Sequence, residues 1–221
     1  MRVFTEIEIA KIQQAISEKK EKFPQEWLGR TLAYTPYQPR PLPEIFKKPV
    51  DSIPRILYDF SLQTLDTSAT QISLLQTAKD YESRACGFFV ESLEILTYIR
   101  RYVSIPLIYD FLILDSYQLL ESLVYGADSV VLLPKFLTQK QLKNLSDYAT
   151  KIGLSIIFRI ESKEDLTKAI FSKADILDLN ENFSLLSMIP KNKIILSKIP
   201  KNFQESHQNY FKALDITILE L

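Results

Sequence analysis

The sequence predicts an α/β fold of the (β/α)8 type, in which eight parallel strands alternate with helices and close into a barrel. From residue 53 onward, short β-branched or aromatic runs alternate with helical patterns. The runs are continuously apolar, as is typical of strands covered on both faces. Eight such runs favour a closed barrel. The strands are expected near 54–60, 85–90, 105–111, 128–133, 154–160, 174–179, 193–197 and 214–219.

An open, doubly wound sheet is the alternative architecture. That fold carries a glycine-rich phosphate turn after its first strand, and none follows residue 60 here. Helix signals between the strands fit either fold. Thr138–Gln141 and Ser162–Asp165 have the spacing of capping boxes, and Gly153 stands where a helix would end on a left-handed residue.

Residues 1–52 form a separate N-terminal region, and 53–221 form the barrel domain. Thr5–Glu8 predicts a capping box, followed by one apolar helical face and the charged run 18–22, which we interpret as solvated. Five prolines between Pro36 and Pro49 then forbid regular helix. We expect a strap lying on the barrel; Pro36–Pro39 also matches a PxxP ligand. Trp27 is expected to anchor this region, although interfaces favour tryptophan too.

Composition excludes several classes of function. The 27 basic and 27 acidic residues give zero net charge, which argues against nucleic-acid binding, and no polybasic run suggests an anionic membrane. No apolar run approaches the length of a membrane span, and the acidic N-terminus is unlike a signal peptide. One cysteine, Cys86, excludes an internal disulfide. We therefore expect a soluble cytoplasmic protein with no cofactor, and with His207 as the only histidine, no metal site.

The predicted eighth strand ends at the end of the chain, so the barrel is expected to lack its final helix. That helix would cover strands one and eight, and its absence predicts an apolar stripe at this seam. The N-terminal helix or a second chain would fill it. A protein partner or self-association at the seam follows as an expectation.

Several segments, in order and at matching spacing, resemble the indole-3-glycerol phosphate synthase family. The resemblance extends over residues 40–221 and is clearest between 81 and 180. Its motifs are Tyr81-Glu82, Ser104–Gln118, Gly126–Leu133, Gly153-Leu154 with Glu164–Leu166, and Ile176–Asn180. The resemblance implies a TIM-like barrel and a lyase that closes an indole ring on a ring-opened sugar phosphate, releasing carbon dioxide and water. It also implies a general acid, a general base and a phosphate site at the carboxyl ends of the strands.

The residues that the family uses for this chemistry are largely replaced. The first strand, Pro54–Ser61, lacks the family's Glu-x-Lys and Ser-Pro-Ser motifs, and no lysine occurs between Lys79 and Lys135. Asp110 occupies the third-strand lysine position and Arg159 the fifth-strand glutamate position. Because the lysine is missing from the whole segment, shifting the alignment does not restore it.

The phosphate side differs as well. Asn180 is kept, but Asn182 stands where the family has arginine, and Ser197–Ile199 replaces its Glu-Ser-Gly. Glu220 lies near the expected phosphate-binding glycine, and no glycine follows Gly153. Glycine lets backbone amides approach an anion closely, and a carboxylate there would repel phosphate.

The exchange of charges on strands three and five suggests an ion pair. Asp110 and Arg159 reverse the lysine and glutamate of the family, and strand ends converge across a barrel mouth. A bidentate pair there would plug the old site. The alternative is two unrelated surface charges.

Three functions are compatible with these observations. The leading expectation is a catalytically inactive barrel, a pseudoenzyme acting as a binding or structural component of an assembly. The alternative is an active or repurposed lyase of this tryptophan-biosynthesis family that acts on an unphosphorylated ligand, and the third is a small-molecule sensor. No catalytic residue is expected in the leading case, and the candidate mouth residues are Asp59, Asp110, Arg159, Asn180, Asn182, Lys198 and Glu220.

Overall fold

The computed structural model describes residues 4–49, 52–60, 67–199 and 208–221. Eight parallel strands pair in sequence order and close between the first and the last. The open-sheet alternative is therefore wrong. The strands are β1 (Arg55–Asp59), β2 (Ala85–Val90), β3 (Leu107–Tyr109), β4 (Ser129–Leu132), β5 (Ser155–Arg159), β6 (Ile176–Asp178), β7 (Ile194–Lys198) and β8 (Ile216–Glu220).

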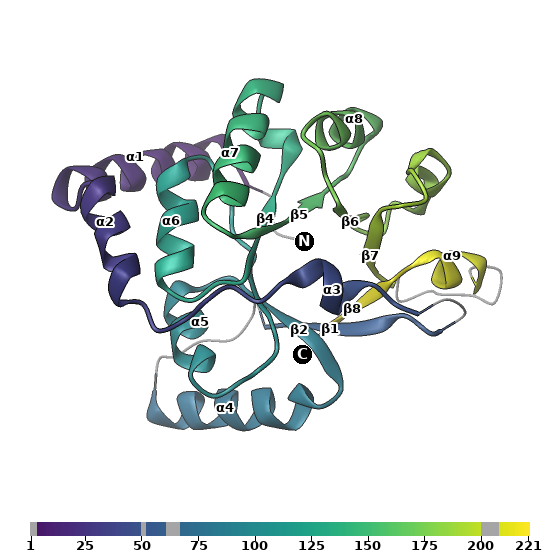
Figure 1. The fold of residues 1–221 in the computed structure, drawn as a ribbon, viewed down its shortest axis with the longest axis horizontal. Coiled ribbons are helices and arrows are strands. Elements are labelled where there is room, and N and C mark those ends of the chain that lie inside the picture. Colours follow the sequence, from purple (N-terminus) through teal and green to yellow (C-terminus); the bar gives the residue numbers. More distant parts are fainter. Residues whose placement is uncertain (1–3, 50–51, 61–66, 200–207) are drawn as a thin grey trace.

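Helices surround the barrel on its outer side (Figure 1). The connections between strands carry α4 (Ser68–Glu82), α5 (Leu93–Arg100), α6 (Ser116–Val124), η2 (Pro134–Phe136), α7 (Gln139–Lys151), α8 (Lys163–Phe171), η3 (Phe183–Met188) and α9 (Gln208–Ala213). Ahead of the barrel lie α1 (Glu6–Lys22), α2 (Gln25–Thr31), η1 (Leu32–Tyr34) and α3 (Leu42–Phe46). None of the helices in the described ranges is long and apolar enough to cross a membrane.

Local signals explain where these helices begin and end. Complete capping boxes start α1 at Thr5 and α7 at Thr138, as predicted. Gly153 ends α7 at a φ of 85°, while its N–H donates to Thr150 and that of Leu154 donates to Ala149. At α8 only half of the predicted box forms. Ser162 accepts from the Asp165 N–H, but the Asp165 carboxylate accepts from Glu161 instead.

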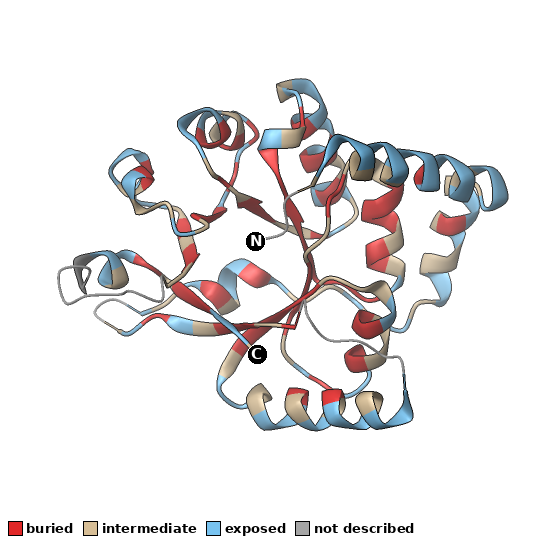
Figure 2. Ribbon diagram, turned by 180° about the vertical axis from the view of Figure 1, so that it is seen from behind, coloured by how far each residue is buried: buried red, intermediate tan, exposed pale blue. Residues whose placement is uncertain are grey.

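The core has two main layers, an interior one enclosed by the strands and a second one between strands and helices. Figure 2 shows the buried strands at the centre and the exposed outer faces of the helices. Every strand contributes at least one apolar side chain to the interior layer. Leu42 and Phe46 of α3 are fully buried in the same cluster. The proline-containing strap therefore inserts apolar side chains into the barrel.

The N-terminal helices pack on α6. Ile16 of α1 and Leu28 of α2 are buried against Tyr117 and Leu120. Trp27 is 55% exposed, so the expectation that it anchors this region is wrong, and Leu28 takes that place. The charged run is not wholly solvated either, because two of its lysines reach α6. Lys19 pairs with Glu121 at 2.6 Å and Lys20 with Asp115 at 2.7 Å.

The seam between β1 and β8 is more covered than expected. By strand alternation, Tyr58 and Thr217 point outward, and both are buried. Tyr58 packs edge-on against Tyr81 of α4, with ring centroids 4.6 Å apart. Leu219, the next outward position on β8, is 37% exposed. Helices α1 and α2 lie on another side of the barrel (Figure 1), and a partner at the seam stays a prediction.

Candidate functional site

Charged side chains gather at the carboxyl ends of the strands. The two-residue period of a strand shows which of them point into the barrel mouth. Leu57, Ile108, Ile157, Ile176, Leu196 and Ile218 all belong to the interior layer. The residue two positions further on points the same way, one layer closer to the mouth. On seven strands that residue is charged. After Phe89 of β2 it is Glu91, and the six that build the site are Asp59, Asp110, Arg159, Asp178, Lys198 and Glu220. They form two clusters on opposite sides of the mouth.

The first cluster is built around Arg159 at the end of β5. Its Nη1 and Nη2 donate to the two oxygens of Asp110 at 2.9 and 2.8 Å, and its Nε donates to Asp178 Oδ2 at 2.6 Å. The guanidinium also lies 5.5 Å from the centre of the Phe89 ring. Burial alone would lower the pKa of Arg159, but the charges of Asp110 and Asp178 outweigh it and raise this pKa. The ion pair suggested by the sequence is thus present, with Asp178 as a further member.

The second cluster is built around Lys198 at the end of β7. Its Nζ lies 3.1 Å from Asp59 Oδ2 on β1 and 2.8 Å from Glu220 Oε1 on β8. The side chains of Lys198 and Asp59 are mostly buried, whereas that of Glu220 is more than half exposed. Burial alone would lower the pKa of Lys198, but the hydrogen bond that it donates to Glu220 and the charge of Asp59 outweigh it and raise this pKa. Lys198 is therefore a protonated donor at neutral pH.

The two asparagines organise the loop after β6. Asn180 adopts a left-handed backbone, φ 47°, and its N–H donates to Asp178 Oδ1 at 3.0 Å. The Asn182 amide donates to the carbonyl of Glu161 at 2.9 Å and accepts from Ser184 Oγ at 2.6 Å. Asn182 thus ties this loop to the one after β5.

Sequence reasoning missed Asp178 and the Lys135–Glu161 pair, which spans 2.9 Å between the loops after β4 and β5. Asp178 carried a usable signal, a carboxylate two residues after an inward apolar residue of a buried run. Within the described residues, no group of three or more His, Cys, Asp or Glu side chains could hold a metal ion. His207 lies outside those residues. Cys86 is buried, and burial raises the pKa of its thiol to about 12, which keeps it protonated.

The fold and the placement of these charges define a (β/α)8-barrel protein whose candidate site lies where enzymes of this fold carry theirs. Solved structures include a similar barrel, an N-acetylmannosamine-6-phosphate 2-epimerase from Clostridium perfringens. It matches with a TM-score of 0.61 at 13% identity, over 83% of this chain and 91% of that one. That likeness extends to the fold alone.

Sequence comparison gives the family. Residues 58–202 match the family model of indole-3-glycerol phosphate synthase. A protein of that name from Campylobacter jejuni (serotype O:6, strain 81116) is 36% identical over 90% of this chain and 87% of the relative. Another, from Campylobacter concisus, is 32% identical over 86% of this chain and 81% of the relative. The chain belongs to the indole-3-glycerol phosphate synthase family, a family of carboxy-lyases in tryptophan biosynthesis.

These comparisons overturn the expectation of a catalytically inactive component. Relatives named as synthases align with nine-tenths of this chain. That expectation rests on the replacement of the residues that the family's motifs place at fixed strand positions. It gave too little weight to the barrel geometry, which brings acids and bases from any strand to the same mouth. Lys198 at the end of β7 lies at this mouth.

Proposed function

We propose that this chain is a lyase of the indole-3-glycerol phosphate synthase type whose acid–base chemistry is carried out by Lys198 together with Asp59 and Glu220. The observation that supports this most directly is the position of Lys198. Its ammonium lies at the carboxyl end of the barrel, within hydrogen-bonding distance of carboxylates from β1 and β8. A protonated lysine beside two carboxylates offers a proton donor and proton acceptors in one place.

The reaction type gives each of these groups a task. Ring closure joins an aromatic carbon to the carbonyl carbon of a ring-opened sugar, and carbon dioxide and water then leave. Lys198 would donate a proton to the carbonyl oxygen as the new bond forms, and again as that oxygen leaves as water. Asp59 or Glu220 would take up the proton released when the indole ring becomes aromatic. Their contact with the lysine returns this proton to it. The second proton that the lysine donates is replaced from water, because loss of a carboxylate as carbon dioxide consumes one proton.

Arg159 has a different role in this proposal. Its Nε, Nη1 and Nη2 all donate to Asp110 and Asp178. With its donors engaged in this way, the guanidinium holds two carboxylates in place across the mouth from Lys198. We assign it to positioning rather than to substrate binding.

A synthase assay tests the proposal. The purified chain is supplied with the ring-opened carboxyphenylamino sugar phosphate, and indole-glycerol phosphate is followed by its fluorescence. The analogue without phosphate is assayed alongside, because Glu220 at the end of β8 disfavours a phosphate dianion. Turnover of either substrate is the expected result.

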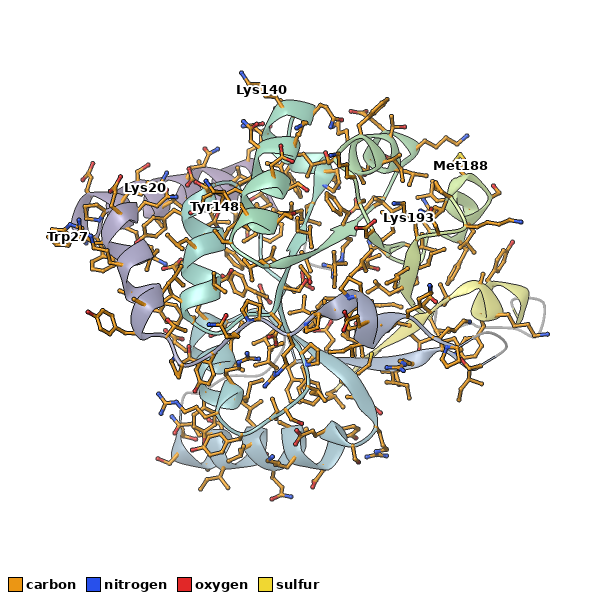
Figure 3. The ribbon with its side chains drawn as sticks, viewed as in Figure 1. Lys20, Trp27, Lys140, Tyr148, Met188 and Lys193 are labelled. Atoms are coloured by element: carbon orange, nitrogen blue, oxygen red, sulfur yellow. The ribbon has the colours of Figure 1, made fainter. Side chains whose placement is uncertain are left out.

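Lys198→Met should lower kcat by about 10²–10⁴-fold, the usual loss on removing one general acid. The matched control is Lys193→Met, since Lys193 precedes the same strand and pairs with Asp175 at 3.2 Å (Figure 3). Its variant should keep wild-type activity. No turnover of either substrate, or equal rates in the two variants, would refute the proposal.

A further inference from the structure

A cavity of about 500 Å³ lies on the outer flank of the barrel, separate from the mouth. It is an open pocket lined by residues of α1, α2, α5 and α6, beside the N-terminal helices seen at the left of Figure 1. This volume falls within the range of small-molecule sites, roughly 300–1,000 Å³. Its lining residues are Lys19, Lys22, Phe23, Leu28, Thr31, Thr97, Tyr117, Glu121, Val124 and Tyr125.

The walls of the cavity are apolar and aromatic. Phe23 and Leu28 come from the N-terminal helices, and Val124 and Tyr125 from the end of α6. Phe23 is held by an edge-on contact with Trp27, with ring centroids 6.1 Å apart. Such walls suit a flat aromatic ring, which gains both apolar burial and edge contacts.

Tyr117 supplies an unused hydrogen-bond donor. The residue is only 3% exposed and lines the cavity, yet its hydroxyl has no hydrogen-bond partner among the residues that the structure describes. Burial, and next the charge of Glu121, raise the pKa of Tyr117, so the hydroxyl keeps its proton. A buried tyrosine hydroxyl ordinarily finds a partner. Here the cavity is where one would bind.

The charges at the cavity favour an anion. Lys19 is neutralised by Glu121 at 2.6 Å. Lys22, one turn further along α1, has no ionic partner in the described part of the chain. The lining therefore carries two ammonium groups against one carboxylate, and Lys22 remains to balance a bound negative charge.

We propose that this cavity binds a small aromatic carboxylate. The ring lies between Phe23, Leu28 and Val124. The carboxylate accepts a hydrogen bond from the Tyr117 hydroxyl, and Lys22 balances its charge. A small molecule fits better than a second copy of the chain because a pocket of about 500 Å³ matches a single small ligand, whereas stable protein interfaces bury about 800 Å² on each partner.

Calorimetric titration with 1-naphthoate tests this proposal, with 1-naphthamide as the uncharged twin of the same shape. Trp27, the only tryptophan of the chain, adjoins Phe23 and reports binding at this place by its fluorescence (Figure 3). We expect 1-naphthoate to bind and to change the Trp27 emission, with the amide at least tenfold weaker. Tyr117→Phe should weaken the binding of 1-naphthoate about tenfold, because it removes a hydrogen bond to a charged group. Lys22→Gln should weaken it about threefold, because it removes a partly exposed charge.

Matched controls keep the test specific. Tyr34→Phe alters a tyrosine that is 88% exposed, and Lys140→Gln alters a lysine at the far end of α7 (Figure 3). Neither should change the affinity, and Lys198→Met at the mouth should not either. Absence of binding, equal affinity for acid and amide, or unchanged affinity in both cavity variants would overturn the proposal. So would self-association of the chain that excludes the probe.

Discussion

Two buried ion clusters lie at opposite ends of the barrel and have opposite compositions. At the amino ends of the strands one carboxylate, Asp128, serves two arginines, Arg40 and Arg100. At the carboxyl ends one arginine, Arg159, serves two carboxylates. The first cluster joins distant backbone segments, whereas the second consists of side chains at strand ends. The first is a scaffold cluster, whereas the second lies at the mouth, where enzymes of this fold carry their sites.

The scaffold cluster ties the N-terminal strap to the barrel. Asp128 is fully buried and accepts from Arg100 Nη1 at 2.7 Å and from the N–H groups of Arg40 and Leu107 at 2.7 and 2.8 Å. Gly126 makes room for the Arg100 side chain, since a Cβ there would lie 2.9 Å from Arg100 Cγ and φ is +98°. The Gly-Ala-Asp motif thus has a structural reason that is independent of catalysis.

The largest effect is expected from Asp128→Ala. The substitution removes the carboxylate that accepts from the buried Arg100 guanidinium and the Leu107 N–H. Removing one partner of a buried ion pair costs about 3–5 kcal/mol. The free energy of unfolding in urea measures the loss. Asp147→Ala is the control, because its pair with Lys143 is exposed and should contribute about 0.3–0.5 kcal/mol. Similar losses in the two variants would remove the distinction between scaffold and surface pairs.

The next effect concerns the mouth and is measured by a double-mutant cycle. Asp110→Ala and Arg159→Ala should each destabilise the fold, while the double variant loses less than their sum. We expect a coupling of about 1–3 kcal/mol, because the pair is bidentate and mostly buried. Asp178 loses its ionic partner in both the Arg159→Ala variant and the double variant. The free-energy cost of that loss therefore cancels from the cycle. Zero coupling would mean that these charges do not form a functional pair in solution.

Strand positions could be predicted from sequence because they depend on local patterns. All eight strands begin within two residues of their predicted starts, including β8, which begins at Ile216. Capping at Thr5, Thr138 and Gly153 follows from residues adjacent in the chain. The connection between β6 and β7 is instead a 3-10 segment.

Long-range contacts could not be predicted in the same way. The apolar face containing Ile16 indicates that α1 packs on something, and it does not say that the partner is α6. Asp110 and Arg159 were paired because a resemblance placed both at strand ends. Asp178 lies inside the Ile176–Asn180 motif, but only the asparagine of that motif is a candidate site residue, so the predicted pair lacks its third member. Likewise, the Gly126–Leu133 motif does not show that Asp128 binds two arginines, because these lie 28 and 88 residues away in the sequence.

The smallest effect is expected from Glu82 at the scaffold end, in the Tyr81-Glu82 motif. Its Oε1 accepts from the N–H and the hydroxyl of Ser104, both at 2.6 Å. Burial alone would raise the pKa of Glu82, but the Ser104 and Lys79 hydrogen bonds outweigh it and lower this pKa. A carboxyl group with a depressed folded pKa stabilises the protein above its unfolded pKa, near 4.3, and this contribution is lost as pH falls through the folded value.

Glu82→Gln should therefore cost about 0.5–1 kcal/mol at pH 7 and less at pH 3, as urea unfolding at both pH values would measure. Glu94→Gln, which alters an exposed glutamate in the first turn of α5, is the control and should be nearly neutral. A loss that does not diminish at low pH would mean that Glu82 acts through packing rather than charge.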